Sequence, residues 1–239
     1  YNSKGAPYVN WYNQSTHHII SWQPGTSSIT SLNDYPMNLR MANMGLANYY
    51  ATGDNSYLNW VNDYVNGWIT TTNSSQQSNG RCFSGTCILP VNVDPNTGQP
   101  GNPWYVSTIN ASQTLGWNNG FGPIRTMRDS FASIFQVTRD NKYPDFLARQ
   151  VKFLFNRGSN GLPALTYDGN NWVTGGRDVH FGIMAVQTAI NKNLQDTELN
   201  TLIDNFITAK IRTAPNVYDY MGEKDPYRYM VLDLWQVNK

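Results

Sequence analysis

Apolar positions recur at helical spacing through the middle of the chain, over residues 117–157. One stripe comprises Met127, Phe131, Ile134 and Phe135, and the next comprises Leu147, Val151, Leu154 and Phe155. Steps of three and four residues place each set on one face of a helix. Residues 138–143 supply a turn in which Asp140 or Asn141 can cap the second helix, Pro144 suits its first turn, and Gly158 can end it. The pattern predicts an antiparallel helical hairpin.

The same pattern occurs twice more. The turn Thr-Gly-Asp-Asn-Ser-Tyr at 52–57 resembles Thr-Arg-Asp-Asn-Lys-Tyr at 138–143, and both turns lie between apolar stripes. A more diverged pair of stripes covers 179–192 and 196–213. Helical hairpins that each expose an apolar face bury it by stacking on one another. The sequence therefore predicts a mainly all-α domain over residues 1–239, a small or incomplete α/α toroid of repeated hairpins.

Long polar segments without a helical period join these hairpins, at 70–122, 156–180 and 218–229. Loops of this length in a compact domain usually cover or form a binding site. The second segment also contains a minor β-hairpin, in which residues 165–167 and 172–173 flank a tight turn at 168–170. If the hairpins form a ring, all three segments gather at one rim.

Residues able to bind and transform an acidic sugar occur in these segments. They include cations, amides, aromatic rings, and the His and Tyr side chains that can transfer protons. The candidates are Trp104, Tyr105, Trp117, Asn118, Asn119, Arg125, Arg128, Asp129, Tyr167, Trp172, Arg177, Asp178, His180, Lys224, Tyr227, Arg228 and Tyr229.

Composition narrows the classes of partner. Only 14% of residues are charged and the formal net charge is +1, which gives no basic surface for nucleic acid. Aromatic residues make up 13% and Asn is frequent, a combination that suits sugar binding as well as a neutral secreted surface. No apolar run approaches the roughly 20 residues of a membrane span. Because the chain starts at Tyr1 without Met, we expect a processed product or a fragment of a longer secreted or periplasmic protein.

The two cysteines, Cys82 and Cys87, are close enough in sequence to bridge a turn. An even count favours one disulfide and an oxidising compartment, with free thiols as the alternative. Two Cys without a neighbouring His leave too few ligands for zinc, so the prediction is no metal here.

The start of the chain has few regular signals. Residues 1–33 are expected to be coil with a short strand or helix, and His17 and His18 to be a solvated or capping pair. Asn33 and Asp34 precede Pro36 as a helix cap would. Three methionines at helical spacing, Met37, Met41 and Met44, are expected in the core.

Repeated hairpins with polar loops on one rim, the stretch Tyr-Tyr-Ala-Thr-Gly-Asp at 49–54, and abundant Trp, Tyr and Asn resemble the α/α-toroid carbohydrate-active enzymes, above all the polysaccharide lyases. The resemblance implies cleavage of a uronic-acid polymer by β-elimination. It implies that Asn118 or Asn119 and Arg177 hold the carboxylate, that His180 is the base, and that Tyr167 or Tyr229 is the acid. Charge develops on the carboxylate as the neighbouring proton leaves, so it must be neutralised.

Two other functions remain open. A glycoside hydrolase on the same scaffold would use paired carboxylates, Asp129 and Asp178, with Asp34 or Glu223 as further candidates. A non-catalytic glycan-binding domain would need only the aromatic groove. We expect a monomer that needs no cofactor; Ca²⁺ on Asp129, Asp168 and Asp178 is the alternative that some lyases suggest, although no calcium-loop spacing is present.

Overall fold

The structure is a computed structural model, and it describes residues 11–20, 33–74, 82–83, 86–90, 92–99, 123–167, 172–174, 179–212 and 227–239. These residues are mainly helical, as the sequence predicts. A 3-10 helix, η1 (Pro36–Leu39), leads into the first α-helix, and a π-helical segment, η3 (Ile207–Arg212), extends the sixth. The α-helices are α1 (Arg40–Thr52), α2 (Asn55–Ser74), α3 (Pro123–Thr138), α4 (Lys142–Arg157), α5 (Val179–Asn191), α6 (Thr197–Phe206) and α7 (Tyr227–Asn238).

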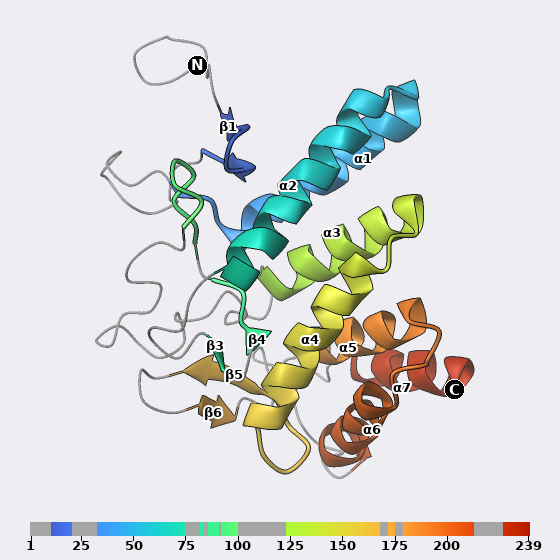
Figure 1. Ribbon diagram of the computed structural model, residues 1–239. Helices are drawn as coiled ribbons and strands as arrows, with labels where there is room; N and C mark the ends of the chain where they lie inside the picture. The colour runs from blue at the N-terminus through green and yellow to red at the C-terminus, as the bar shows by residue number, and fades with distance from the viewer. Residues whose placement is uncertain are drawn as a thin grey trace.

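The helices are arranged as hairpins in two rows (Figure 1). In the first row α1 contacts α3, α3 contacts α5, and α5 contacts α7; in the second row α2, α4 and α6 each pack against the preceding helix of the first row. Short turns join α1 to α2, α3 to α4 and α5 to α6 at one end of the rows. Helices α1, α3 and α5 therefore begin at the opposite end, which we call the helix-start rim. Helix α7 begins at this rim too, because its C-terminal end lies on the side of the turns (Figure 1).

Three small antiparallel strand pairs accompany the helices. They are β1 (Tyr12–Asn13) with β2 (His18–Ile19), β3 (Cys82–Phe83) with β4 (Thr86–Cys87), and β5 (Ala164–Tyr167) with β6 (Trp172–Thr174). The last pair confirms the predicted β-hairpin, with Tyr167 opposite Trp172. It lies at the end of the molecule where α3 and α5 begin (Figure 1).

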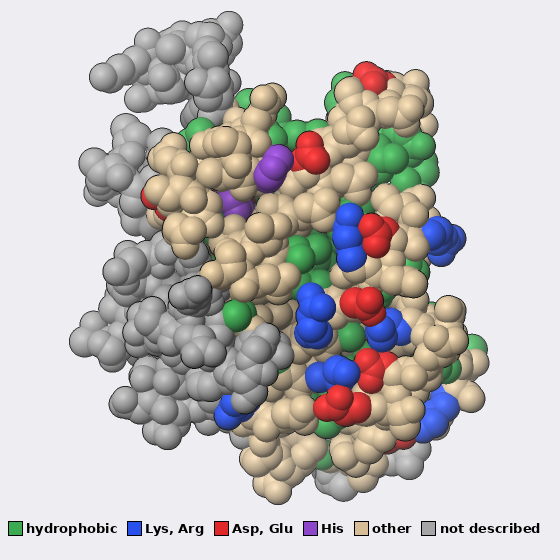
Figure 2. Space-filling model, viewed as in Figure 1, with side chains coloured by type: hydrophobic (Ala, Val, Ile, Leu, Met, Phe, Trp, Pro, Cys, Tyr) green, Lys and Arg blue, Asp and Glu red, His purple; other side chains and the backbone are tan. Residues whose placement is uncertain are grey.

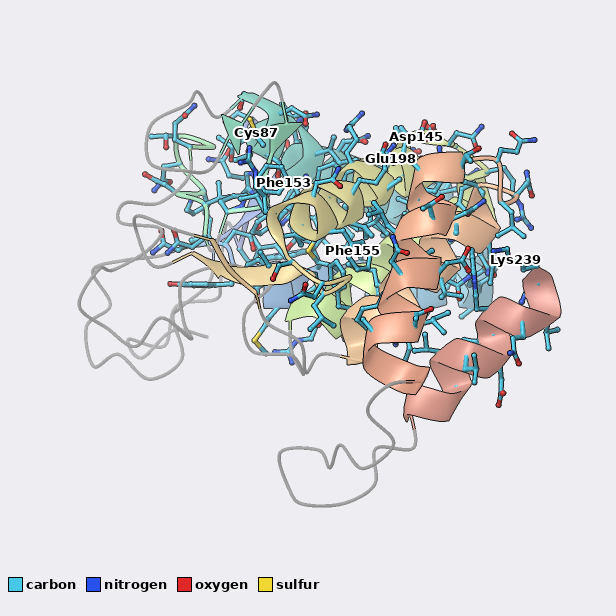
Figure 3. All side chains as sticks on the ribbon, turned by 90° about the horizontal axis from the view of Figure 1, so that it is seen from below. Cys87, Asp145, Phe153, Phe155, Glu198 and Lys239 are labelled. Carbon is cyan, nitrogen blue, oxygen red and sulfur yellow. The ribbon has the colours of Figure 1, made fainter. Side chains whose placement is uncertain are left out.

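The core lies between the two rows and includes apolar residues of all three hairpins, among them Leu46, Val61 and Trp68 of the first. All the stripe residues named for α3 and α4 are less than a tenth exposed. Phe155 of α4, labelled in Figure 3, meets Phe181 of α5 and Phe206 of α6 with ring centroids 5.2 and 5.8 Å apart, which joins three helices. Gly182 allows this approach, because a Cβ there would lie 2.5 Å from the Phe206 ring. Aromatic edge-to-face contacts of this kind add to the burial energy.

The ends of the first row differ from the prediction. Met37 and Met44 were expected in the core, yet they are 43% and 58% exposed, and Tyr50 near the end of α1 is 70% exposed. Met230 of α7 is also 43% exposed. The physical reason is position: α1 and α7 are the terminal helices of the row (Figure 1), so each has a neighbour in the row on one side only. Helical spacing identifies a repeated apolar face but not whether another helix covers it.

The structure describes one of the two cysteines of the predicted disulfide in full. Cys87 is disulfide-bonded, and the β3–β4 register places Cys82, the other cysteine of the chain, directly opposite it. The Cys82 side chain lies outside the described residues, so the Cys82–Cys87 pairing stays a prediction that the backbone register favours.

Charged side chains of both signs alternate along one face, over α4 and the α5–α6 turn (Figure 2). Their ion pairs include Lys142 with Asp140, Lys192 with Asp145, and Lys152 with both Asp196 and Glu198. Burial acts to raise the pKa of Asp196, but the hydrogen bond from the Leu199 N–H and the Lys152 ammonium outweigh it, and the net pKa is lowered. Positive and negative charges are therefore paired on this face, and neither sign dominates it. None of the helices in the described ranges is long and apolar enough to cross a membrane.

Candidate functional site

Three candidate residues from the sequence analysis lie in helix beginnings at the helix-start rim. Arg125 is in the first turn of α3, His180 in the first turn of α5, and Tyr229 in the first turn of α7. Because α3 contacts α5 and α5 contacts α7, these three positions lie at one end of three adjacent helices. The backbone thus supports the predicted gathering of the junctions, while the orientation of these three side chains lies outside the described part of the chain.

Many of the predicted site residues fall in ranges that are not described. They are Trp104, Tyr105, Trp117, Asn118, Asn119, Asp168, Arg177, Asp178, Glu223 and Lys224. Tyr167 and Trp172 are placed by their backbone alone, as partners in β5 and β6. The roles assigned to all these residues stay predictions.

Helix starts have an electrostatic property that suits an acidic sugar. The first backbone N–H groups of a helix have no partner within the helix, and the aligned peptide dipoles place partial positive charge there. Four helices begin along this rim, so the partial positive charge recurs at each of their starts (Figure 1). A carboxylate bound at the rim would be stabilised by it.

Asp129 lies on α3 one helical turn beyond Arg125, a spacing that puts both on the same face. Arg128 donates from Nε to its Oδ1 at 2.7 Å, and the Asp129 side chain is 39% exposed. The carboxylate is accessible and charge-paired, as a substrate-facing group can be. The hydrolase hypothesis pairs it with Asp178, which lies outside the described residues.

A histidine–aspartate pair that the sequence did not predict lies between the first strand hairpin, η1 and α2. His18 Nδ1 is 2.9 Å from Asp34 Oδ2, and His18 Nε2 is 2.9 Å from Thr71 Oγ1. Asp34 also accepts from the backbone N–H of Ile19 and, through Oδ1, from Asn38 Nδ2 and Tyr64 OH at 3.0 and 3.1 Å. The expectation that His18 is solvated or capping is therefore wrong.

The hydrogen-bonded chain Thr71–His18–Asp34 resembles the nucleophile, base and carboxylate of a catalytic triad. The burial of all three side chains argues instead for a structural role. The His18 and Asp34 side chains are 0% exposed and Thr71 is 4% exposed. The Thr71 hydroxyl also donates to the Gly98 carbonyl at 2.9 Å. A substrate cannot reach these atoms, so Asp34 is not an accessible carboxylate for hydrolysis. Asp34 also does not cap the helix, because the cap residue of η1 is Tyr35 without a side-chain cap bond.

A polar hollow of about 470 Å³ occurs at the opposite end of the molecule. Its walls come from the start of α4 and the α5–α6 turn, and the Lys192–Asp145 ion pair lies in them. Ligand pockets usually combine apolar walls with a few polar groups. This hollow is lined by Asn141, Asp145, Asn191, Lys192, Asn193, Gln195, Asp196 and Thr197, without an aromatic ring or a histidine, so we do not assign it as the sugar site. Within the described ranges no group of three or more His, Cys, Asp or Glu side chains is arranged to hold a metal.

Comparison with known proteins supports the fold. No family model matches the sequence, and no curated protein matches it. Among solved structures, a sugar epimerase from a ruminal bacterium is similar with a TM-score of 0.52 and 11% sequence identity, over 77% of this chain and 46% of that one. This chain thus spans about half the length of that protein. At this identity the likeness shows a shared helical architecture.

Proposed function

We propose that the protein is a carbohydrate-active enzyme that removes a carbon-bound proton from a sugar at the helix-start rim, and that it cleaves a uronic-acid polysaccharide by β-elimination. The observation that carries the proposal is the placement of Arg125, His180 and Tyr229 in the first turns of α3, α5 and α7, which are adjacent. The architecture shared with a sugar epimerase supports a carbohydrate substrate.

The reaction assigns one role to each type of group. His180 takes the C5 proton, and the electrons of that C–H bond form the double bond between C4 and C5. The C4–O bond breaks, and Tyr229 or Tyr167 supplies a proton to the leaving oxygen. Arg177, with Asn118 or Asn119, neutralises the carboxylate beside C5, where negative charge develops. The helix starts that lie side by side along the rim add partial positive charge there.

A second candidate is epimerisation, and the similarity to the sugar epimerase is the observation that favours it. Removal of the carbon-bound proton by His180 and delivery of a proton to the other face by a second acid, Tyr229 or Tyr167, would invert the carbon. Elimination and epimerisation thus share their first step and differ in the fate of the carbanion. In deuterium oxide, an epimerase that works in this way leaves deuterium on an intact sugar, whereas a lyase shortens the polymer.

Product masses test the proposal against hydrolysis. We expect purified protein, incubated with pectate, alginate and glycosaminoglycans with and without Ca²⁺, to release fragments that lack one water relative to hydrolysis products, because elimination adds no water across the cleaved bond. Mass spectrometry of the fragments measures this. Fragments that contain the added water would contradict the lyase and transfer the assignment to Asp129 and Asp178.

We also propose that the protein acts in an oxidising compartment outside the cytoplasm. Cys87 is disulfide-bonded, and disulfides persist in oxidising compartments. A secreted or periplasmic location would also give the enzyme access to extracellular polysaccharides.

A further inference from the structure

An aromatic surface lies on α2, in the second row of helices, where the β1–β2 hairpin packs against it. Trp11 and Tyr12 come from the hairpin, and their ring centroids lie 5.4 and 5.8 Å from that of Trp60. Trp11 is 43% exposed, and Tyr57, one helical turn before Trp60, is 37% exposed. We call Trp11, Tyr12, Tyr57 and Trp60 the Trp11 platform. It does not include any residue assigned to the helix-start rim.

The platform rests on a fixed base. Trp60 stacks on Tyr64 with centroids 5.5 Å apart and planes 14° from parallel. Tyr64 is fully buried, and its hydroxyl donates to Asp34. The Tyr12 hydroxyl lies 3.3 Å from His17 Nδ1. Rings held in this way lose little conformational freedom when a ligand binds, so more of the contact energy appears as affinity.

Polar groups lie beside the platform. Asp63 is an exposed residue one helical turn after Trp60. Its spacing from Trp60 puts both residues on the same side of α2. Burial raises the pKa of the Tyr12 phenol, and the negative charge of Asp63 raises it further. An exposed apolar ring beside a hydrogen-bond acceptor matches a ligand that has one apolar face and peripheral hydroxyl groups.

We propose that the Trp11 platform binds a pyranose unit of a neutral glycan. The C–H face of the sugar would lie on Trp11, and a sugar hydroxyl would donate to Asp63. A carboxylate beside the rings disfavours an acidic sugar, which separates this surface from the rim proposed for uronates. A quaternary ammonium ligand needs rings around an open space, whereas these rings pack directly against one another. The platform thus provides an anchor on neutral polysaccharide separate from the reaction site.

Affinity electrophoresis tests this, with soluble β-glucan, glucomannan and xylan each embedded in a native gel. We expect at least one polymer to retard the wild-type protein, and Trp11→Ala to weaken binding by about tenfold or more, the loss expected for an anchoring tryptophan. Tyr50→Ala is the matched control. Tyr50 is 70% exposed on α1 and its ring meets Tyr49, so this variant removes an exposed aromatic residue outside the platform and should bind as wild type.

Tyr57→Ala provides a second variant if Trp11→Ala fails to fold, because Tyr57 is exposed on α2 one helical turn before Trp60. His180→Ala should bind these polymers as the wild type does, so failure of the enzyme proposal leaves the binding result standing. Absence of retardation by all three polymers would overturn the proposal, as would an equal loss of binding in Tyr50→Ala.

Discussion

Asp34→Ala should lower the free energy of unfolding by about 3–5 kcal/mol, because each buried donor left without its acceptor costs about 1–3 kcal/mol and Asp34 serves several. The Asp34 carboxylate is 0% exposed and accepts bonds from His18, Ile19, Asn38 and Tyr64. Its removal leaves these four donors without their acceptor. For a chain of this length the loss corresponds to a fall in melting temperature of roughly 6–20 °C, measured by circular dichroism.

Asp233→Ala is the control for this prediction, because Asp233 is exposed on α7 and surface substitutions usually change stability by less than about 0.5 kcal/mol. A melting temperature for Asp34→Ala that matches that of Asp233→Ala would contradict the role of Asp34 as an anchor. His18→Ala should be destabilised as Asp34→Ala is, since it breaks the same pair from the other side.

His180→Ala should reduce turnover by about 10²–10⁴-fold, the contribution of a positioned general base. Its melting temperature should stay close to that of the wild type if the imidazole serves catalysis and not packing. The assay is the initial rate on the polysaccharide that gives the best wild-type rate. Circular dichroism and glycan binding by the same sample establish that the loss is catalytic.

The chain provides its own control, because it has three histidines. His17 is partly exposed in the turn of the β1–β2 hairpin, and His17→Ala should retain turnover. Unchanged turnover in His180→Ala would remove His180 from the reaction site, whatever the fate of the other assignments.

The helical hairpins could be predicted because their evidence is local and repeated. Phe131, Phe135 and Leu147 belong to stripes that continue for several turns, and a periodic stripe specifies which face is buried. Pro144 lies in the first turn of α4 and Gly158 ends it, as the sequence predicts. The boundaries of the third hairpin are also close to prediction, although α6 gives way to the π-helical segment at Ile207.

The buried network could not be predicted in the same way. His18, Asp34 and Thr71 come from three elements, and the pairs that bond are 16 and 53 residues apart. Neither His18 nor Asp34 lies in a periodic segment, so no local pattern indicates that they meet. The pair becomes recognisable only when α2 and the β1–β2 hairpin pack together.

The helix-start rim could be predicted in part. Periodicity located the beginnings of α3 and α5, and hairpin topology implied that the beginnings share one end of the molecule. The residues between the helices have no period, and their side-chain placement depends on contacts that the sequence pattern does not encode. Arg125, His180 and Tyr229 are therefore supported by the position of their helices, and Asn118, Asn119 and Arg177 rest on the resemblance to the lyases.

The measurement that tests the central claim most directly is the ultraviolet absorbance of an unsaturated uronate, recorded while wild-type protein acts on acidic polysaccharides with and without Ca²⁺. The proposed lyase predicts a steady rise with at least one polymer, because each cleavage creates one C4=C5 double bond conjugated to the carboxylate. No rise with any of the polymers, from protein whose fold is verified by circular dichroism, would contradict β-elimination.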